Sequence, residues 1–305
     1  MDTLTARQDL AVLTEISAAL AYAGLDLPVV LDTISDLLVT HVADLAMIHL
    51  LADDGVTLDL ASTASRDPAV SDFARDVLGS RPRRVDDPSL IGQAFKTRQP
   101  MVAAETEINR RTRTVTERYG DLAAPFHFHG LAYIPLVSEG ESIGVIGVMR
   151  YQAGVHTGFG DDALELMYDI VELATPTVVH ARLHDQLAEA NALFETAFAA
   201  APVAMAIHSA ASSSQFVRAN ASFAALVGRA EAELIGTPVH AVIAQADQRR
   251  IEALLDRVAS GELQASSTSL RLERGDGATI TVRTTSRMVH MGSGLILTQV
   301  PAPLT

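Results

Sequence analysis

The sequence LAYIPLVSEGESIGVIGVMRY, at residues 131–151, predicts an antiparallel hairpin. Two apolar runs of strand length flank residues 138–141, where Ser, Glu and Gly are typical of a tight turn. The second run, residues 143–149, is apolar at odd and even positions alike. That pattern is expected for a strand with both faces buried, so this hairpin belongs in the middle of a sheet.

The segments before this hairpin predict helices and a further hairpin. Apolar residues at helical spacing predict helices over residues 4–22 and 28–41. The Asp-Asp-Gly turn at residues 53–55 separates two strand-like runs and predicts a hairpin. Residues 87–99 predict a short helix, and the polar, Arg-rich residues 106–120 predict a loop with a short helix. The first part of the chain is therefore expected to mix helices with one sheet.

A long helix is predicted to follow, beginning at Asp161 and Asp162 and running to about residue 199. Pro176 lies inside it and is expected to kink or interrupt it, because proline lacks the helical N–H donor. Beyond residue 202, two short strands, short helices and an amphipathic helix at residues 248–260 are predicted. Three strands close the chain, at residues 264–274, 278–290 and 293–300.

This pattern predicts an α+β fold in which two antiparallel-sheet modules are joined by a long helix. The first module is expected at residues 1–182, with an N-terminal helix and an exit helix. The connecting helix is expected at residues 183–200 and the second module at residues 201–305. Neither a dinucleotide-binding glycine pattern nor a P-loop occurs in the sequence.

Composition and charge exclude several classes of function. The net charge of −14 argues against non-specific nucleic-acid binding, which depends on clustered Lys and Arg. The chain has no cysteine, so disulfides, zinc–thiolate sites and thiol nucleophiles are excluded. No apolar run approaches the roughly 20 residues of a membrane span, and the N-terminus has no secretory signal pattern. We therefore expect a cytoplasmic protein that binds neither membrane nor nucleic acid directly.

Three segments in the first module resemble a GAF domain. They are SLIGQAFKTRQPMVAAE, LAYIPLVSEGESIGVIGVMR and GFGDDALELMYDIVELA, in that order and with the usual gaps. The resemblance includes a strand that contains Pro135 and a strand of the G-V-x-x-V type at residues 144–148. It covers about residues 10–182.

The second module resembles a PAS domain over about residues 191–300. The resemblance lies in LFETAFAAAPVAMAIHS, FVRANASFAALVGRAEAELIG, the helix after them and the final three strands. Its most recognisable motif is Arg218-Ala219-Asn220, followed by Phe223. Together the two resemblances imply a regulatory sensor that binds a small molecule or a partner, dimerises, and passes the signal to an output domain.

Candidate ligand contacts in the GAF-like module come from the expected pocket between its sheet and the Arg-rich segment. The arginines suit an anionic ligand, although a solvated face explains them equally, and the signature of cyclic-nucleotide-binding GAF domains is missing. The candidate residues are His49, Phe95, Arg110, Arg111, Arg113, Phe126, His127, Phe128, His129 and Tyr133.

The sequence FHFHG at residues 126–130 leaves two interpretations open. His127 and His129 would share one face of an extended segment and could bind haem or a metal, with Asp121 or His49 as further ligands. Alternatively the phenylalanines pack inward and the histidines face the loop. We favour the second interpretation, and we predict no metal and no cofactor other than an unknown small molecule.

In the PAS-like module, a small pocket is predicted around Met205, Phe216, Asn220 and Phe223, with ordinary core packing as the alternative. Because cysteine is missing, a flavin–cysteinyl adduct is excluded. The helix at residues 248–260 contains no histidine, so a haem ligand is not expected there, and His240 is the nearest upstream.

The long helix carries an alternating three- and four-residue repeat, which is typical of a coiled-coil seam and predicts a homodimer. The repeat consists of Ile170, Leu173, Thr177, His180, His184, Leu187, Asn191, Phe194 and Phe198. Packing of this face on the chain's own sheet is the alternative. His180 and His184 are one turn apart, so protonation near pH 6.5 would bring like charges together and is expected to make the dimer weakly pH-sensitive.

The sequence therefore predicts a non-enzymatic, dimeric sensor. No G-x-S-x-G or H-E-x-x-H motif occurs, and the acidic pairs are explained as turn and cap residues. The output is expected to be a partner protein or a domain outside this chain, and the resemblance suggests a cyclic-di-GMP synthase or a serine phosphatase. The alternatives are a haem- or metal-binding gas or redox sensor and a ligand-free dimerisation scaffold.

Overall fold

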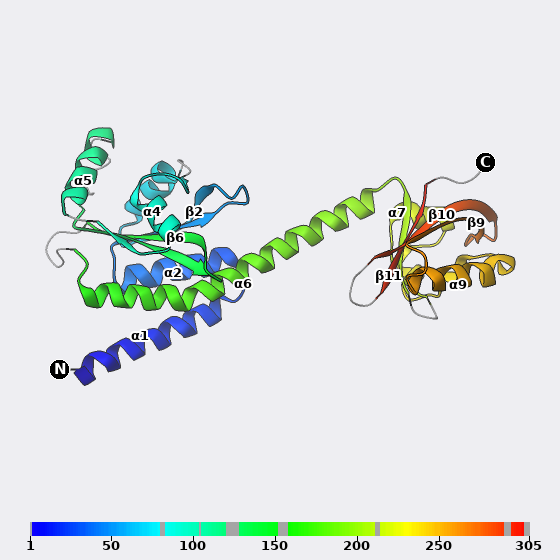
Figure 1. Cartoon of the computed structure of the whole chain (residues 1–305), viewed down its shortest axis with the longest axis horizontal. Helices are drawn as coiled ribbons and strands as arrows, with labels where there is room; N and C mark the ends of the chain where they lie inside the picture. The colour runs from blue at the N-terminus through cyan, green and yellow to red at the C-terminus, as the bar shows by residue number, and fades with distance from the viewer. Residues whose placement is uncertain are drawn as a thin grey trace. The chain divides into compact units, whose positions relative to one another are not determined.

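The chain forms two compact units, Met1–Leu187 and Ala188–Thr305, each built on an antiparallel sheet (Figure 1). The computed structural model describes residues 2–79, 83–103, 105–119, 128–151, 158–210, 214–289 and 294–301. The predicted α+β class, with two sheets and a long helix, is confirmed. The ranges predicted for the modules, 1–182, 183–200 and 201–305, stay predictions.

The sheet of the first unit has the strand order β3-β2-β1-β6-β5-β4, so β6 is a central strand, as predicted. A two-residue turn joins β5 to β6: Glu139 and Gly140 have φ of 51° and 80°, the left-handed values that a type I′ turn requires. The strands are β1 Leu45–Leu51, β2 Thr57–Ser65, β3 Arg83–Arg84, β4 Met101–Val102, β5 Gly130–Ser138 and β6 Glu141–Arg150.

Both faces of this sheet are buried under helices (Figure 1). Alternate residues of β1 serve different cores: Ile48 packs with Ile146 and Ile170 on one face, and Met47 packs with Val145 on the other. The first face is covered by α2 Leu27–His41 and α6 Asp161–Ala200, and α1 Asp2–Ala23 packs against α2. The second is covered by α3 Pro68–Phe73, the π-helical turn η1 Ala74–Leu78, α4 Leu90–Thr97 and α5 Glu105–Tyr119.

One local prediction was wrong, and a second was wrong in part. Residues 106–120 were expected to be a loop with a short helix, but α5 is a 15-residue helix. Glu107 supports it by pairing with Arg110 and Arg111 at helical spacing, and such pairs stabilise an otherwise polar helix. Pro176 was expected to kink or interrupt α6; the interruption is contradicted, because α6 is a continuous 40-residue helix, and the kink stays a prediction.

The second unit has the strand order β8-β7-β11-β10-β9. Its strands are β7 Ala204–Ser209, β8 Phe216–Ala219, β9 Ala265–Glu273, β10 Thr279–Val289 and β11 Leu295–Val300. Its helices are α7 Ala221–Val227, α8 Glu231–Leu234, the 3-10 turn η3 Val239–Val242 and α9 Gln245–Ala259. The core lies between the sheet and these helices, with Phe223, Ile251 and Val282 inside it.

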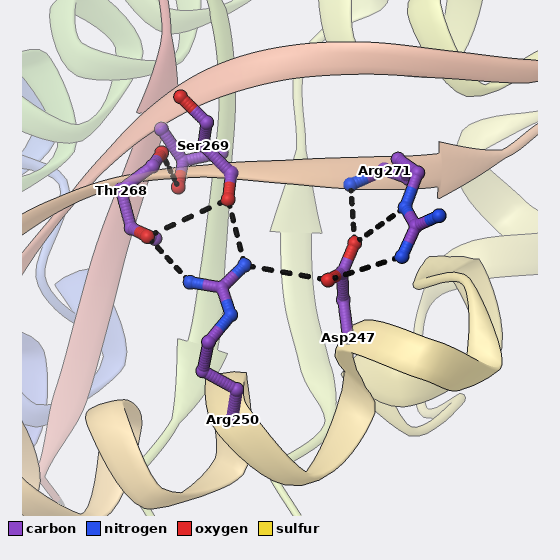
Figure 2. Close-up of polar contacts among 6 residues, drawn as sticks. Asp247, Arg250, Thr268, Ser269 and Arg271 are labelled. Carbon is purple, nitrogen blue, oxygen red and sulfur yellow. Dashed lines mark hydrogen bonds and ion pairs between the residues drawn. The ribbon is translucent and has the colours of Figure 1, made fainter.

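Polar side chains of α9 hold the edge strand β9 (Figure 2). The Asp247 carboxylate accepts hydrogen bonds from the Arg271 backbone N–H and from its guanidinium, both at 3.0 Å. These bonds from Arg271 lower the pKa of Asp247 to about 2. Arg250 donates to the Thr268 hydroxyl and to the Ser269 carbonyl, each at 2.7 Å. These contacts hold α9 against the sheet and pair backbone groups on the open edge of β9.

Candidate functional site

A cavity of about 40 Å³ lies inside the second unit, between the sheet and the helical segments η3 and α9. Its wall is mainly apolar, with Phe216, Phe223 and Ile251 among its residues. The polar part of the wall is a group from strands β7, β9, β10 and β11: His208, Thr268, Thr284, Ser286 and Thr298. The cavity thus combines an apolar lining with a few placed polar groups, which is typical of small-molecule sites.

His208 is the centre of the polar wall and is 1% exposed. Its Nδ1 lies 2.7 Å from the Ser214 hydroxyl oxygen, and its Nε2 lies 2.9 Å from the Thr298 hydroxyl oxygen. The Thr298 hydroxyl is also 2.8 Å from the Ser286 hydroxyl. Both ring nitrogens therefore have partners, and a hydrogen-bonded chain connects β7 to β10 and β11.

The Ser209 carbonyl determines the direction of this chain, because a carbonyl oxygen only accepts hydrogen bonds. The Ser214 hydroxyl donates to the Ser209 carbonyl at 2.6 Å, so its oxygen accepts from His208 Nδ1–H. His208 Nε2 is then the acceptor for the Thr298 hydroxyl, whose oxygen accepts from Ser286. One neutral tautomer of His208, with the proton on Nδ1, satisfies every partner.

Burial keeps His208 uncharged at neutral pH. Loss of solvent around the ring lowers its pKa to about 4, although the Ser209 backbone carbonyl acts in the opposite direction. The ring also meets Phe216 edge-on, with centroids 6.5 Å apart. The polar wall of the cavity is therefore neutral at pH 7.

A second hollow of about 110 Å³ adjoins the cavity. Val239, Ile243, Ile251 and Leu255 line both spaces and form the partition between them. The outer hollow is more polar, and its wall includes His240, Glu252 and Asp256. The acidic residues give this outer space a negative character that the inner cavity lacks.

The predicted pocket residues of the second unit divide into two groups. Phe216 and Phe223 line the cavity, whereas Met205 and Asn220 do not. Asn220 is buried and structural: its Oδ1 accepts from the N–H groups of Met205 and Phe223, both at 2.9 Å. Its Nδ2 donates to the Val203 carbonyl at 2.8 Å. Asn220 thereby caps α7 and ties it to β7.

The first unit has a more open pocket of about 450 Å³ between α4 and α5. Arg110 and Arg111 line it, as predicted, but Glu107 and Asp87 line it as well, so its charges balance. Glu107 accepts from Arg110 at 2.6 Å and from Arg111 at 2.8 Å, and these bonds lower the pKa of Glu107. This balance does not favour an anion.

The other residues predicted for this site are dispersed. Arg113 is exposed, and Phe95 and Phe128 are half-buried against the core, while Tyr133 is buried and accepts a hydrogen bond from Arg111. His49 is buried in β1 on the same face of the sheet. Loss of solvent, with a smaller effect of Arg83, lowers the pKa of His49 to about 4. Phe126, His127 and Asp121 lie outside the described residues.

Family models match both units of this chain. A model described as GAF domain matches residues 24–178, and one described as PAS fold matches residues 198–294. The chain belongs to the GAF domain family. A PAS domain follows the GAF domain, which is the order that the sequence predicts. The two sensory domains point to a signal-sensing regulatory protein.

Each domain is similar to solved structures, and the match extends over almost the whole length of those solved chains. The GAF domain of a phosphoenolpyruvate-protein phosphotransferase from Coxiella burnetii is 16% identical, with a TM-score of 0.44, over 58% of this chain and 96% of that chain. The corresponding Acinetobacter domain is 15% identical, with a TM-score of 0.42, over 60% of this chain and 97% of that chain. The PAS domain of an HTR-like protein from Haloarcula marismortui is 21% identical, with a TM-score of 0.35, over 40% of this chain and 98% of that chain. No curated protein matches the chain significantly.

His129 stands just before β5 of the GAF domain, and its backbone N–H donates to the Arg150 carbonyl at 2.7 Å. Its Nε2 is buried and has no hydrogen-bond partner among the described residues. No three His, Asp or Glu side chains within the described parts of the chain gather as metal ligands. His129 thus has no metal-binding companions in the described structure.

The helix α6 links the GAF and PAS domains and is exposed on all sides over residues 183–197. Of the predicted seam residues, Ile170 lies in the GAF core and Phe198 is buried. The remaining ones, Leu173, Thr177, His180, His184, Leu187, Asn191 and Phe194, are exposed or half-buried. Among the helices of the described residues, none is both long and apolar enough to cross a membrane.

Sequence analysis missed His208, Ser286 and Thr298, which carry the polar wall of the PAS cavity. In β7 every second residue, including His208, faces inward. This alternation could have been read from the sequence and would have predicted a buried histidine. Its partners Thr298 and Ser286 are ordinary strand residues and carry no such signal.

Proposed function

We propose that this protein is a non-enzymatic signal sensor whose PAS domain binds a small molecule in the cavity beside His208. The bound state would be passed along α6, within a homodimer, to a partner protein or to an output domain outside this chain. The observation that carries the proposal is the apolar cavity with one ordered polar wall. Protein interiors are normally close-packed, with few voids of this kind, whereas a ligand site keeps such a space open.

The PAS cavity is a better ligand site than the GAF pocket for two reasons. The arginines of the GAF pocket already pair with Glu107, so a ligand would have to compete for them. The apolar core on that face of the GAF sheet is filled by side chains such as Tyr133 and Met149. The PAS cavity offers apolar space beside polar groups that are held in place.

The ligand proposal is tested by adding a small-molecule extract of the host cells to the full chain and recording ligand-observed NMR spectra, which detect weakly bound molecules. Ala206 is fully buried on β7 and lines the cavity, so Ala206→Val fills part of the space. Ala265→Val adds the same volume on the exposed end of β9 and serves as the control. We expect the signals of at least one extract molecule to change with the wild type and the control, but not with Ala206→Val. Identical spectra with all three proteins would contradict the proposal.

The dimer seam that we propose on α6 differs in part from the predicted one. It consists of Leu173, Pro176, His180, Leu183, Leu187, Ala190, Phe194 and Ala197, which are all exposed. Their spacing alternates between three and four residues, as a coiled coil requires. Leu173, His180, Leu187 and Phe194 belong to both seams. Between them the proposed seam has Pro176, Leu183, Ala190 and Ala197, whereas the predicted seam has Thr177, His184, Asn191 and the buried Phe198.

The charges on α6 support a second copy of this chain as the occupant of the proposed seam. Over residues 179–200 the charged side chains are Arg182, Asp185, Glu189 and Glu195, and the seam and its flanking positions contain none of them. Glu195 pairs with Arg218 of its own PAS domain. A chain with a net charge of −14 repels its copy, so an uncharged apolar stripe is where two copies could meet.

The variant Leu187→Glu is expected to weaken the dimer by at least about 100-fold. Leu187 is 62% exposed in the single chain, and in the dimer the variant would lose apolar burial from both copies and place two carboxylates side by side. Ala192→Glu puts the same charge on the outer face of α6 and is expected to leave the dissociation constant unchanged. Sedimentation of the full chain would measure both. A monomeric wild type, or equal effects of the two variants, would contradict this seam.

A further inference from the structure

Hydrogen-bond directions inside the PAS cavity restrict what it can bind. In the described wall, the hydroxyl hydrogen of Thr298 is committed to His208 Nε2, and that of Ser286 to Thr298. The Thr284 hydroxyl donates to the Thr268 carbonyl at 3.4 Å, and the Thr268 hydroxyl to the Ser269 carbonyl at 3.5 Å. The proton on His208 Nδ1 is committed to Ser214. The hydrogens of Thr298, Ser286 and His208 are thus in use, whereas the contacts of Thr284 and Thr268 are long for O–H···O hydrogen bonds.

Acceptor capacity remains in this wall. A hydroxyl oxygen accepts up to two hydrogen bonds. Within the described structure, the Thr298 oxygen accepts from Ser286, and the Ser286 oxygen accepts none that we observe. Beside Ser286 and Thr298, a molecule in the cavity would therefore meet oxygen lone pairs and no spare hydroxyl donor of the described wall. A ligand that only accepts hydrogen bonds would leave its own polar atom unpaired, and that is unfavourable in a buried space.

The charges around the cavity point in the same direction. No Asp, Glu, Lys or Arg side chain lines the inner cavity among the described residues. Burial keeps His208 neutral, and an ion in this space would contact no charged side chain of the described lining. The acidic Glu252 and Asp256 line the adjoining hollow and disfavour an anion on that side of the cavity.

We infer that the PAS cavity selects a small, uncharged, mainly apolar molecule that donates one hydrogen bond, such as an alcohol, to the Ser286–Thr298 oxygens. This ligand class rests on the proposed function of the cavity and specifies it further. The volume of about 40 Å³ has room for only a few water molecules, so the ligand has few non-hydrogen atoms unless the side chains move apart. Ser286 and Thr298 are the residues that determine specificity.

Three probes of four non-hydrogen atoms each test this selection: propan-2-ol, which donates and accepts, acetone, which only accepts, and acetate, which is an anion. A ligand of this size binds no tighter than roughly 40 µM, so NMR titration of the full chain is suitable. The methyl signals of Val242, Ile251 and Leu255 in the cavity wall report binding. We expect propan-2-ol to bind at least about tenfold tighter than acetone, because acetone cannot pair with the wall, and acetate to cause no shift.

The variants separate failure of the ligand class from failure of the cavity as a site. Ala206→Val is expected to abolish the propan-2-ol shifts, and Ala265→Val to leave them unchanged. Acetone or acetate binding as tightly as propan-2-ol would overturn the ligand class and leave the proposed function standing. If no probe distinguishes the wild type from Ala206→Val, then both the class and the ligand-binding function of this cavity are overturned.

Nitrogen chemical shifts of His208 provide a second readout that does not depend on any probe. The chain of hydrogen bonds requires a neutral ring at pH 7 with the proton on Nδ1. A proton on Nε2 would reverse the chain, release a hydroxyl donor at Ser286 and overturn the inferred preference for donating ligands.

Discussion

Lowering the pH from 7 to 4 is expected to reduce the free energy of unfolding of the PAS domain by about 3 kcal/mol through His208 alone. In the unfolded chain this histidine binds a proton below about pH 6.5, whereas burial lowers its pKa in the native state to about 4. Between these values the unfolded state binds more protons. The contribution is therefore fully present above pH 6.5 and is lost, at about 1.4 kcal/mol per pH unit, as the pH falls to 4.

Domain-resolved measurements on the full chain test this effect. All 5 tyrosines lie in the GAF half of the chain, so tyrosine fluorescence follows the unfolding of the GAF domain. Hydrogen exchange of the β10 and β11 amides follows the PAS domain. In the variant His208→Asn, the pH slope of the PAS domain should decrease by about 1.4 kcal/mol per unit, and that of the GAF domain should not change. An unchanged PAS slope would show that His208 is not the responsible group.

The variant Asn220→Ala is expected to reduce the free energy of unfolding of the PAS domain by about 3 kcal/mol. Asn220 is 1% exposed, and its amide satisfies the N–H groups of Met205 and Phe223 and the Val203 carbonyl. Alanine would leave these buried backbone groups unpaired and would remove the cap of α7. Because Phe223 in α7 lines the cavity, retention of a bound molecule should decrease as well.

The matched control is Asn191→Ala, which removes the same amide from the exposed part of α6. A surface substitution of this kind is expected to change stability by less than about 0.5 kcal/mol. Denaturant unfolding followed by hydrogen exchange in β7 and α7 would measure both variants. If Asn220→Ala reduced the free energy of unfolding by less than about 1 kcal/mol, water would be replacing the amide, and the link between α7 and β7 would not depend on this side chain.

Local patterns in the sequence were sufficient for most of the fold. The apolar runs on both sides of the Glu139-Gly140 turn identified β5 and β6, because a two-residue turn and a doubly buried strand each have a clear signature. The Arg-rich α5 was missed because its helix depends on Glu107 pairing with Arg110 and Arg111, whereas its apolar periodicity is weak.

The candidate site was less accessible from the sequence because its groups are distant along the chain. His208 and Thr298 are 90 residues apart and meet only when β7 pairs with β11. Asn220 looked like a pocket residue, but it follows β8 and precedes the ASFAALV helix, the position of a cap. On α6, the repeat alone could not show that Ile170 and Phe198 are covered by their own domains.

Titration of the full chain with propan-2-ol, followed by NMR, tests the central claim most directly. We predict that the methyl signals of Val242, Ile251 and Leu255 shift in the wild type and in Ala265→Val, and that they do not shift in Ala206→Val. Shifts of equal size in the wild type and in Ala206→Val, or no shifts in either, would contradict a ligand-sensing PAS cavity and would favour a dimerisation scaffold instead.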